Sequence, residues 1–214
     1  LTRACLQVCA EYRNPVGIIT KGVISTRDLD LFTQLHERAW IRVYFSIAFA
    51  DDETARLVEP QAPGISARFE AMRVLSKAGI PTGISVAPII PGLNEEAIPE
   101  ILSRARHAGA TSATGSLLRL SGHVEQVFVE RMREAFPDRI SKILHRIREV
   151  RGGALSDAEF FSRHHGTGTY WHCVEQLFEL GRRRAGFEPD DVPIPQTFRR
   201  PTAQQSLFCV EESL

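Results

Sequence analysis

Apolar residues in the first half of the chain follow two alternating patterns. Short runs rich in β-branched and aromatic residues predict four buried strands, at residues 16–20, 41–47, 82–89 and 112–119. Between these runs, apolar residues recur at spacings of three and four, which is typical of helices with one buried face. The helices are predicted at about residues 2–12, 26–38, 66–78 and 95–108. The segment after the second strand, which contains Pro60 and Pro63, is predicted to be a loop.

Strands that are apolar on both faces and alternate with helices indicate a parallel sheet covered by helices. We therefore expect the four strands to be adjacent in sequence order, with helices on one side. Functional residues then lie at the carboxyl ends of the strands, as in a barrel. Four units are too few to close an eight-stranded barrel, so either the sheet is open or strands are missing in front. The chain begins with Leu1 rather than methionine, which favours missing strands in a longer protein.

After residue 121 the pattern changes to helices without strands, predicted at residues 125–135, 139–150 and 170–184. From about residue 188, prolines and polar residues predict an extended tail. We expect an α/β fold in three parts. They are a partial parallel βα barrel of about four units (residues 1–121), a helical extension (122–187) and a flexible tail (188–214).

Composition narrows the class of protein. The chain has 43% hydrophobic residues and 26 basic against 26 acidic residues, which is ordinary for a globular protein. No apolar run approaches the roughly 20 residues that span a bilayer, so no membrane is expected as a partner. Four cysteines are too few and too scattered for a disulfide scaffold, and we expect a cytoplasmic location. The neutral net charge does not call for nucleic acid, although it can hide a local basic patch.

Several motifs resemble one known family. Residues 14–21 (NPVGIITK) are similar to the third strand of radical S-adenosylmethionine (SAM) proteins related to spore photoproduct lyase. The motifs LVEPQAP and RFEA (57–63 and 68–71) resemble the loop and helix after their fourth strand. Residues 78–94, which end in PGLN, resemble their fifth strand and the loop that follows it. Three later motifs resemble a branch of the same family, FPDR (136–139), RGG (151–153) and GTGTY (166–170).

The resemblance covers roughly residues 1–187 and implies a partial (βα)6 barrel. In that family a [4Fe–4S] cluster, held by three cysteines in a C-x3-C-x2-C loop, cleaves SAM to a radical that abstracts hydrogen. Cys5 and Cys9 have the first spacing, but Tyr12 stands in the third position. The segment reads as a helix ahead of the third strand, so we expect both cysteines to be buried helix residues. We therefore expect no metal ligands in this chain, and no turnover by it alone.

Two candidate site residues belong to the first two predicted strands. Lys21 ends the first strand and can meet the SAM carboxylate or a substrate phosphate as a point charge, unless it is simply solvated. Ser46 lies where related enzymes place a polar residue that touches the ribose or amino acid part of SAM, and a buried hydroxyl needs a partner. The chain then departs from the family, because residues 48–50 (AFA) replace hydroxyl-bearing residues. Arg56 and Glu59 are predicted to pair on a surface turn.

Three further candidates follow the third and fourth predicted strands. Gly92 lies where many radical SAM enzymes pass their backbone close to the adenine, and it permits that approach because it lacks a Cβ. Asn94 is a candidate for the same loop or an ordinary helix N-cap. Arg119 can bind a carboxylate or phosphate bidentately, although arginines at strand ends are also common on surfaces.

Two motifs of the extension carry alternatives. His164 and His165 suggest a metal, but adjacent histidines do not share a helical face and no cysteine or aspartate lies at ligand spacing, which favours a surface loop. Residues 166–168 (GTG) can cradle a phosphate ahead of a helix. The motif does not follow a strand, so a helix-start turn is favoured.

The tail carries a candidate partner site. Gln204, Ser206, Leu207 and Phe208 match the motif by which bacterial repair and replication proteins dock on the sliding clamp, while Gln205 departs from the preferred leucine. Apolar anchors on an extended tether are a common recognition mode. The alternative is that these residues carry no function or pack back onto the domain.

The sequence therefore predicts a C-terminal fragment of a radical SAM enzyme, with SAM and a [4Fe–4S] cluster as cofactors of the full-length protein. Its spore photoproduct lyase relatives repair a thymine lesion, which makes nucleic acid one possible substrate class, although kinship does not transfer a substrate. The alternatives are a non-catalytic interaction module that docks a partner such as the sliding clamp, and a phosphate-binding βα enzyme without a cluster.

Overall fold

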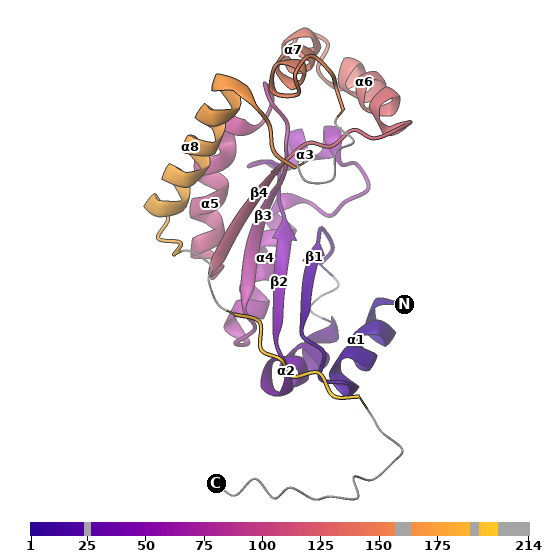
Figure 1. Cartoon of the computed structure of the whole chain (residues 1–214), viewed down its shortest axis with the longest axis vertical. Helices are drawn as coiled ribbons and strands as arrows, with labels where there is room; N and C mark the ends of the chain where they lie inside the picture. Colours follow the sequence, from indigo (N-terminus) through magenta and orange to yellow (C-terminus); the bar gives the residue numbers. More distant parts are fainter. Residues whose placement is uncertain (24–26, 157–163, 189–192, 201–214) are drawn as a thin grey trace, which may run out of the picture.

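A computed structural model describes residues 1–23, 27–156, 164–188 and 193–200 of the chain. Its centre is one four-stranded sheet with the order β1-β2-β3-β4 (Figure 1). All neighbouring strands are parallel. The strands are β1 (Val16–Thr20), β2 (Ile41–Ser46), β3 (Thr82–Ile89) and β4 (Ser112–Leu117). The predicted α/β class, the strand order and the parallel pairing are confirmed.

The helices of the βα units follow the predicted ranges closely. They are α1 (Thr2–Glu11), α2 (Leu29–Arg38), α4 (Ile65–Lys77) and α5 (Ile98–His107), the last preceded by the short 3-10 helix η2 (Glu95–Ala97). One helix falls in a segment that was predicted to be a loop, α3 (Asp52–Val58). The Asp51 carboxylate accepts a hydrogen bond of 2.6 Å from the Thr54 amide, which caps this helix. Its acidic first turn adds a favourable interaction with the helix dipole.

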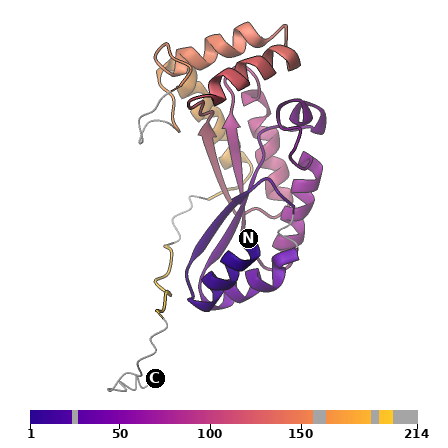
Figure 2. The same cartoon turned by 90° about the vertical axis from the view of Figure 1, so that its right-hand side faces the viewer.

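One face of the sheet is covered by helices and forms the core. Helices α2, α4 and α5 pack against β2 and β3, and Figure 2 shows them together on one side of the strands. The side chains that meet there are completely buried, among them Leu35, Val43, Phe45, Met72 and Ile84. Burial of each such side chain stabilises the fold by about 1.5–3 kcal/mol. The period-two alternation of β2 and β3 therefore places their largest apolar residues under the helices.

The opposite face of the sheet is more polar and partly exposed. Ile19, Tyr44, Gly83 and Ser112 pair in register across the four strands on this face. Ile19 is 72% exposed. A Cβ built on Gly83 would lie 2.5 Å from the Tyr44 ring, so the absence of a side chain lets the Tyr44 ring lie flat on the sheet. We call this surface the open face.

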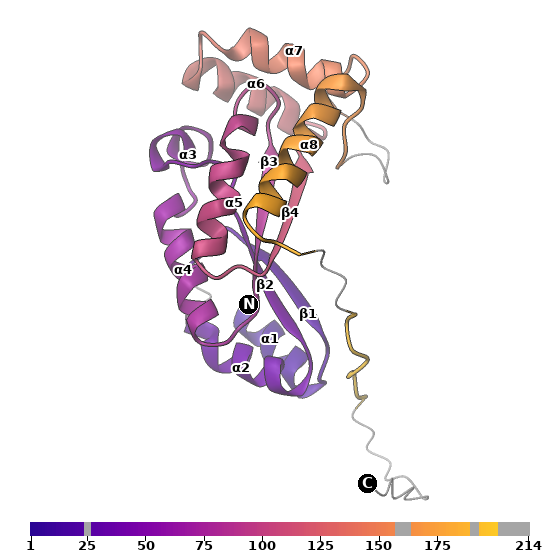
Figure 3. The same ribbon diagram turned by 90° about the vertical axis from the view of Figure 1, so that its left-hand side faces the viewer.

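The helical extension docks on the sheet at two places. Helix α8 (Gly168–Arg184) packs along α5 (Figure 3). Helices α6 (Val124–Ala135) and α7 (Ile140–Val150) lie beyond the carboxyl ends of the strands (Figure 1). No helix in the described ranges is both long and apolar enough to cross a membrane.

Residues 193–200 run past the amino-terminal end of the sheet to the end of α1 (Figures 1 and 2). The Arg199 amide donates to the Tyr12 carbonyl at 2.9 Å, and the Thr197 hydroxyl donates to the Arg13 carbonyl at 2.8 Å. The rings of Phe198 and Tyr12 stack, with their centroids 6.5 Å apart. The candidate clamp motif, with Gln204, Ser206, Leu207 and Phe208, lies outside the described residues.

Candidate functional site

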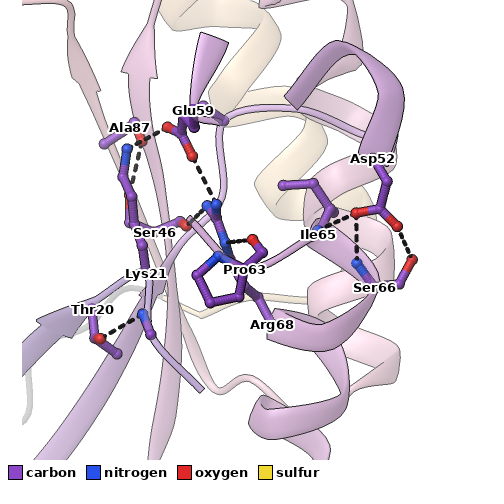
Figure 4. A network of polar contacts seen from close by, with 12 residues as sticks. Thr20, Lys21, Ser46, Asp52, Glu59, Pro63, Ile65, Ser66, Arg68 and Ala87 are labelled. Atoms are coloured by element: carbon purple, nitrogen blue, oxygen red, sulfur yellow. Dashed lines mark hydrogen bonds and ion pairs between the residues drawn. The ribbon is translucent and has the colours of Figure 1, made fainter. Parts of the chain in front are cut away.

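A network of charged groups joins the carboxyl ends of β1 and β2 (Figure 4). Lys21 follows β1 and its ammonium group forms an ion pair with Glu59. The second carboxylate oxygen of Glu59 accepts a hydrogen bond of 2.8 Å from Arg68. Arg68 is 1% exposed and also donates to the Ser46 carbonyl at 2.9 Å and the Pro63 carbonyl at 2.8 Å. The network thus connects two predicted site residues, Lys21 and Ser46, through two that sequence reasoning did not assign to the site.

Glu59 corrects one prediction. It does not lie on a surface turn, because its side chain is only 8% exposed and its partners are Lys21 and Arg68. The reason is that α3 ends and α4 begins on either side of it, so the connecting loop folds inward. One residue of the sequence could have indicated this burial. Arg68 of the RFEA motif is a cation on a predicted helix, and Glu59 is its carboxylate partner.

The loop that carries Glu59 is fixed by Asp52 (Figure 4). The Asp52 carboxylate accepts hydrogen bonds from the Ile65 amide, from the Ser66 amide at 3.3 Å and from the Ser66 hydroxyl at 2.8 Å. These bonds, led by that of the Ser66 hydroxyl, lower the pKa of Asp52. Asp52 therefore caps the start of α4 from the start of α3 and closes the loop between them.

Charge in the Lys21–Glu59–Arg68 trio is unbalanced, because two cations share one carboxylate. Each of the three guanidinium nitrogens of Arg68 donates to one acceptor, Pro63, Ser46 or Glu59, and the group is buried. Lys21 keeps 39% of its side chain exposed and has three donors, of which Glu59 takes one. The excess positive charge of the trio is therefore presented by the Lys21 ammonium group, which suits a carboxylate or phosphate.

Hydroxyl groups cross the open face beside this network. Ser46, Ser85 and Thr114 pair in register on three neighbouring strands. The Ser46 hydroxyl donates to the Ala87 carbonyl at 2.8 Å, which leaves its lone pairs available as acceptors. Ser46 is 5% and Ser85 7% exposed, whereas Thr114 is exposed. We call these three residues the hydroxyl row.

The Asn94 side chain forms hydrogen bonds within the protein. Its amide nitrogen donates to the Ala48 carbonyl at 2.7 Å and the Pro88 carbonyl at 3.0 Å, and its oxygen accepts from the Ile90 amide at 2.7 Å. With 5% exposure, the side chain ties the loop after β3 to the end of β2. It makes no side-chain N-cap bond to the helix that follows.

Gly92 makes its close backbone approach to a helix of the extension. It has a positive φ of 84°, and a Cβ built on it would lie 3.3 Å from the Cα of Ile143 and from the Cγ of Arg146. Both residues belong to α7. The missing side chain therefore lets α7 lie against the loop.

Arg119 lies two residues beyond β4 and is exposed. Within the described ranges it has no hydrogen bond or ion pair that would hold it. Its neighbour Leu118 accepts a hydrogen bond of 2.8 Å from Arg151 through its carbonyl. Arg119 is thus placed at the carboxyl edge of the sheet, next to the end of α7, with its guanidinium facing solvent.

The two motifs with alternatives lie in the turn before α8. The carbonyls of His164 and His165 accept bonds from the Leu117 amide at 3.0 Å and from Arg151 at 3.2 Å. Thr167 is the N-cap position of α8, and its amide donates to the Val150 carbonyl at 2.9 Å. A Cβ on Gly166 would lie 2.7 Å from the Trp171 ring. The geometry favours a helix-start turn over a phosphate cradle.

The cysteines do not form a cluster site in the described part of the chain. Cys5 and Cys9 lie on α1 as predicted, but Cys5 is exposed and Cys9 is half-buried. The prediction that both are buried is wrong for Cys5, because α1 packs through Leu6 and Ala10 instead. No group of three metal-ligating side chains occurs among the described residues. The cysteine side chains of the described residues therefore do not fit a [4Fe–4S] cluster.

The fold belongs to the class of parallel βα proteins, whose ligand sites lie beyond the carboxyl ends of the strands. Residues 1–105 match the model of the Radical SAM superfamily, and the four-stranded parallel sheet is consistent with part of that superfamily's barrel. SAM and a [4Fe–4S] cluster are the cofactors general to that superfamily.

The chain is also similar to individual proteins, whose names state no substrate. The chain is 32% identical over 130 residues to the uncharacterized protein Rv2578c of Mycobacterium tuberculosis, covering 60% of this chain and 38% of that protein. It is 27% identical over 164 residues to the uncharacterized protein ORF301 of Acidianus two-tailed virus, covering 72% of this chain and 50% of that protein. The chain thus spans half or less of the length of these relatives. No solved structure matches.

Proposed function

We propose that this chain forms the SAM-binding part of a radical SAM enzyme. The observation that carries the proposal is that the excess positive charge at Lys21 follows the end of β1, while the hydroxyl row starts from Ser46 at the end of the neighbouring strand β2. Within the proposal, Lys21 binds the carboxylate of SAM, and Ser46, Ser85 and Thr114 offer hydroxyls to its ribose and amino acid parts. Asn94 and Gly92 hold the loop that borders this surface.

Radical cleavage of SAM requires a [4Fe–4S] cluster, which the thiolates of the described residues do not fit. Our proposal for this chain is therefore limited to SAM binding, and we place the cluster ligands in another part of the full-length protein. Arg119, exposed at the same edge, is proposed to bind an anionic group of the substrate.

The finer classification rests on the motifs. We propose that the protein belongs to the spore photoproduct lyase-like branch, acts in the cytoplasm and takes a nucleic acid as its substrate. The support is the order and spacing of the motifs over residues 1–187, together with the exposed guanidinium of Arg119. The second candidate function, an interaction module that docks on the sliding clamp, is supported only by the tail motif. A peptide of residues 198–214 that fails to bind purified clamp would exclude it.

Titration calorimetry of the chain with SAM tests the main proposal. We expect saturable binding with a dissociation constant of about 1 mM or tighter, which corresponds to about −4 kcal/mol. Lys21→Ala and Ser46→Ala should each weaken this binding several-fold. The matched control is His172→Ala, an exposed residue of α8 whose side chain bonds Gln176 on its own helix. Equal effects of all three substitutions, or no binding by the unmodified chain, would contradict the proposal.

A further inference from the structure

A buried carboxylate sits between the loop after β3 and the helical extension. Glu95, in η2, is 8% exposed. One of its oxygens, Oε1, accepts a hydrogen bond of 2.9 Å from the Gly92 amide and another from the hydroxyl of Tyr170. The other oxygen, Oε2, is buried without a hydrogen-bond partner among the described residues. Glu95 thus concentrates its interactions on one oxygen that joins two distant segments.

The carbonyl group of Gly92 is held from the extension as well. Arg139, at the start of α7, donates to the Gly92 carbonyl at 3.0 Å and to the Leu93 carbonyl at 3.4 Å. The Gly92 amide donates to Glu95 and the Gly92 carbonyl accepts from Arg139. The space where a Cβ would stand is bordered by α7. Both polar backbone groups of this residue are therefore fixed by side chains, and not by a strand or helix ladder.

Tyr170 is itself held in place as the donor. The guanidinium of Arg146 lies over its ring, 4.2 Å from the centroid, and Arg146 is paired with Glu149 at 2.6 Å. Burial and the hydrogen bond to Glu95 raise the pKa of Tyr170 above its ordinary value of 10.0. The hydroxyl therefore stays protonated near neutral pH and keeps donating to Glu95.

These contacts give a role to two motifs that a SAM site alone leaves without one, FPDR and GTGTY, and connect both to the PGLN motif. Gly92 belongs to the PGLN motif, Arg139 to FPDR and Tyr170 to GTGTY. They lie far apart in the sequence and meet at Glu95 and its loop. On the other side of the loop, Asn94 continues the connection to the carbonyls of Ala48 and Pro88. Hydrogen bonds and the backbone of the loop together thus connect α8 to the ends of β2 and β3.

From this geometry we infer that Glu95 and Tyr170 are positioning residues that hold the loop of residues 90–95 in its binding shape. We call the bonds among Glu95, Tyr170, Gly92 and Arg139 the loop latch. The latch makes the extension a required part of the site at the strand ends, although no residue of the latch needs to touch the ligand. The effect of the loop latch on SAM binding rests on the proposed function, whereas its effect on the conformation of residues 90–95 does not.

Hydrogen exchange of the loop amides tests the latch directly. Tyr170→Phe removes only the hydroxyl and should accelerate exchange at residues 90–95 on the order of tenfold, the factor expected for loss of a hydrogen bond to a charged group. Glu95→Ala should do the same. Glu95→Gln keeps an acceptor oxygen toward Gly92 and Tyr170 but buries its amide N–H groups where Oε2 has no described partner, so exchange should accelerate less than in Glu95→Ala.

The matched control is Glu175→Ala, which removes another side-chain hydrogen bond of α8, the one of 2.8 Å from Trp171, without touching the loop. Unchanged exchange at residues 90–95 in Tyr170→Phe would overturn the latch. So would acceleration that is equal over the loop and all four strands, because it would report global destabilisation.

The affinity for SAM separates the latch from the proposed function. If the unmodified chain binds SAM, Tyr170→Phe should weaken binding several-fold, and Glu95→Gln should weaken it less than Glu95→Ala. An unchanged affinity in Tyr170→Phe would reject the role of the latch in the site. If the unmodified chain does not bind SAM, the proposed function fails, and the exchange experiment alone decides whether the latch holds the loop.

Discussion

Arg68 shows how a single residue organises the strand-end network. Its guanidinium is buried, and each of its nitrogens has a different acceptor, two of them backbone carbonyls. A buried charge in this position contributes mainly by satisfying groups that would otherwise be left unpaired. Glu59 depends strongly on it, because among the described residues Lys21 alone would remain as an ion-pair partner.

We therefore predict that Arg68→Met lowers the free energy of unfolding by about 3–5 kcal/mol, the cost of breaking a buried ion pair on one side. Adding Glu59→Gln to Arg68→Met should recover part of this loss, since a neutral amide then replaces a buried carboxylate that has lost the partner of one oxygen. Urea denaturation measures both. The control on the same helix is Arg73→Met, whose exposed pair with Glu70 should be worth less than about 1 kcal/mol. Similar losses for Arg68→Met and Arg73→Met would contradict this account.

Tyr170 predicts an alkaline dependence of stability. Its pKa in the folded protein is raised, first by burial and then by the bond to Glu95. A raised pKa means that the unfolded chain releases this proton first, so the stabilisation is complete below pH 10 and is lost as the pH rises toward the folded pKa. Above pH 10 the free energy of unfolding should fall more steeply with pH for the unmodified protein than for Tyr170→Phe. Parallel pH profiles for the two proteins would show that the hydroxyl is not protected.

At the scale of elements, the loop after β3 is shaped by what packs on it. Gly92 is needed both for its positive φ and for the space that α7 occupies. Gly122, in the turn before α6, has a positive φ of 59° as well, but a Cβ built there meets nothing within 4 Å. Comparing substitutions at the two glycines therefore separates the cost of backbone strain from the cost of crowding by a neighbouring helix.

We predict that Gly122→Ala costs about 1–2 kcal/mol, the penalty of a left-handed conformation for a residue with a Cβ. Gly92→Ala should cost more, because α7 must also shift to relieve contacts at 3.3 Å. Thermal unfolding of the two variants, with hydrogen exchange in α7, measures the difference. Equal costs would mean that α7 yields freely and that the loop and the extension are not closely packed.

At the scale of the molecule, the question is whether this chain can assemble a cluster by itself. Cys5 and Cys9 are one helical turn apart on α1, and Cys173 is on α8. A [4Fe–4S] cluster that keeps one iron for SAM needs three thiolates in a common loop. We predict that anaerobic reconstitution with iron and sulfide gives no stable iron–sulfur absorption. A stable band that disappears in Cys5→Ala with Cys9→Ala would refute the prediction.

Local pattern determined much of the fold. The apolar runs at β1–β4 and the helical periodicity between them gave correct elements, because period and propensity are properties of neighbouring residues. The parallel order followed from the alternation of strand and helix. Helix α3 was missed, since its seven residues carry a capping signal at Asp51 but too short a periodic pattern.

The candidate site divides in the same way. Lys21, Ser46, Gly92, Asn94 and Arg119 could be placed at the strand ends from the sequence, since each follows or ends a predicted strand or lies in the loop after it. The partners of Glu59 could not be predicted, and neither could the contact of Tyr170 with Glu95, 75 positions away. Such pairs are specified by how helices dock on the sheet, and no local rule encodes that docking. The sequence alone determined which edge of the sheet carries the candidate site residues, and the tertiary structure decided which side chains there are already committed to one another.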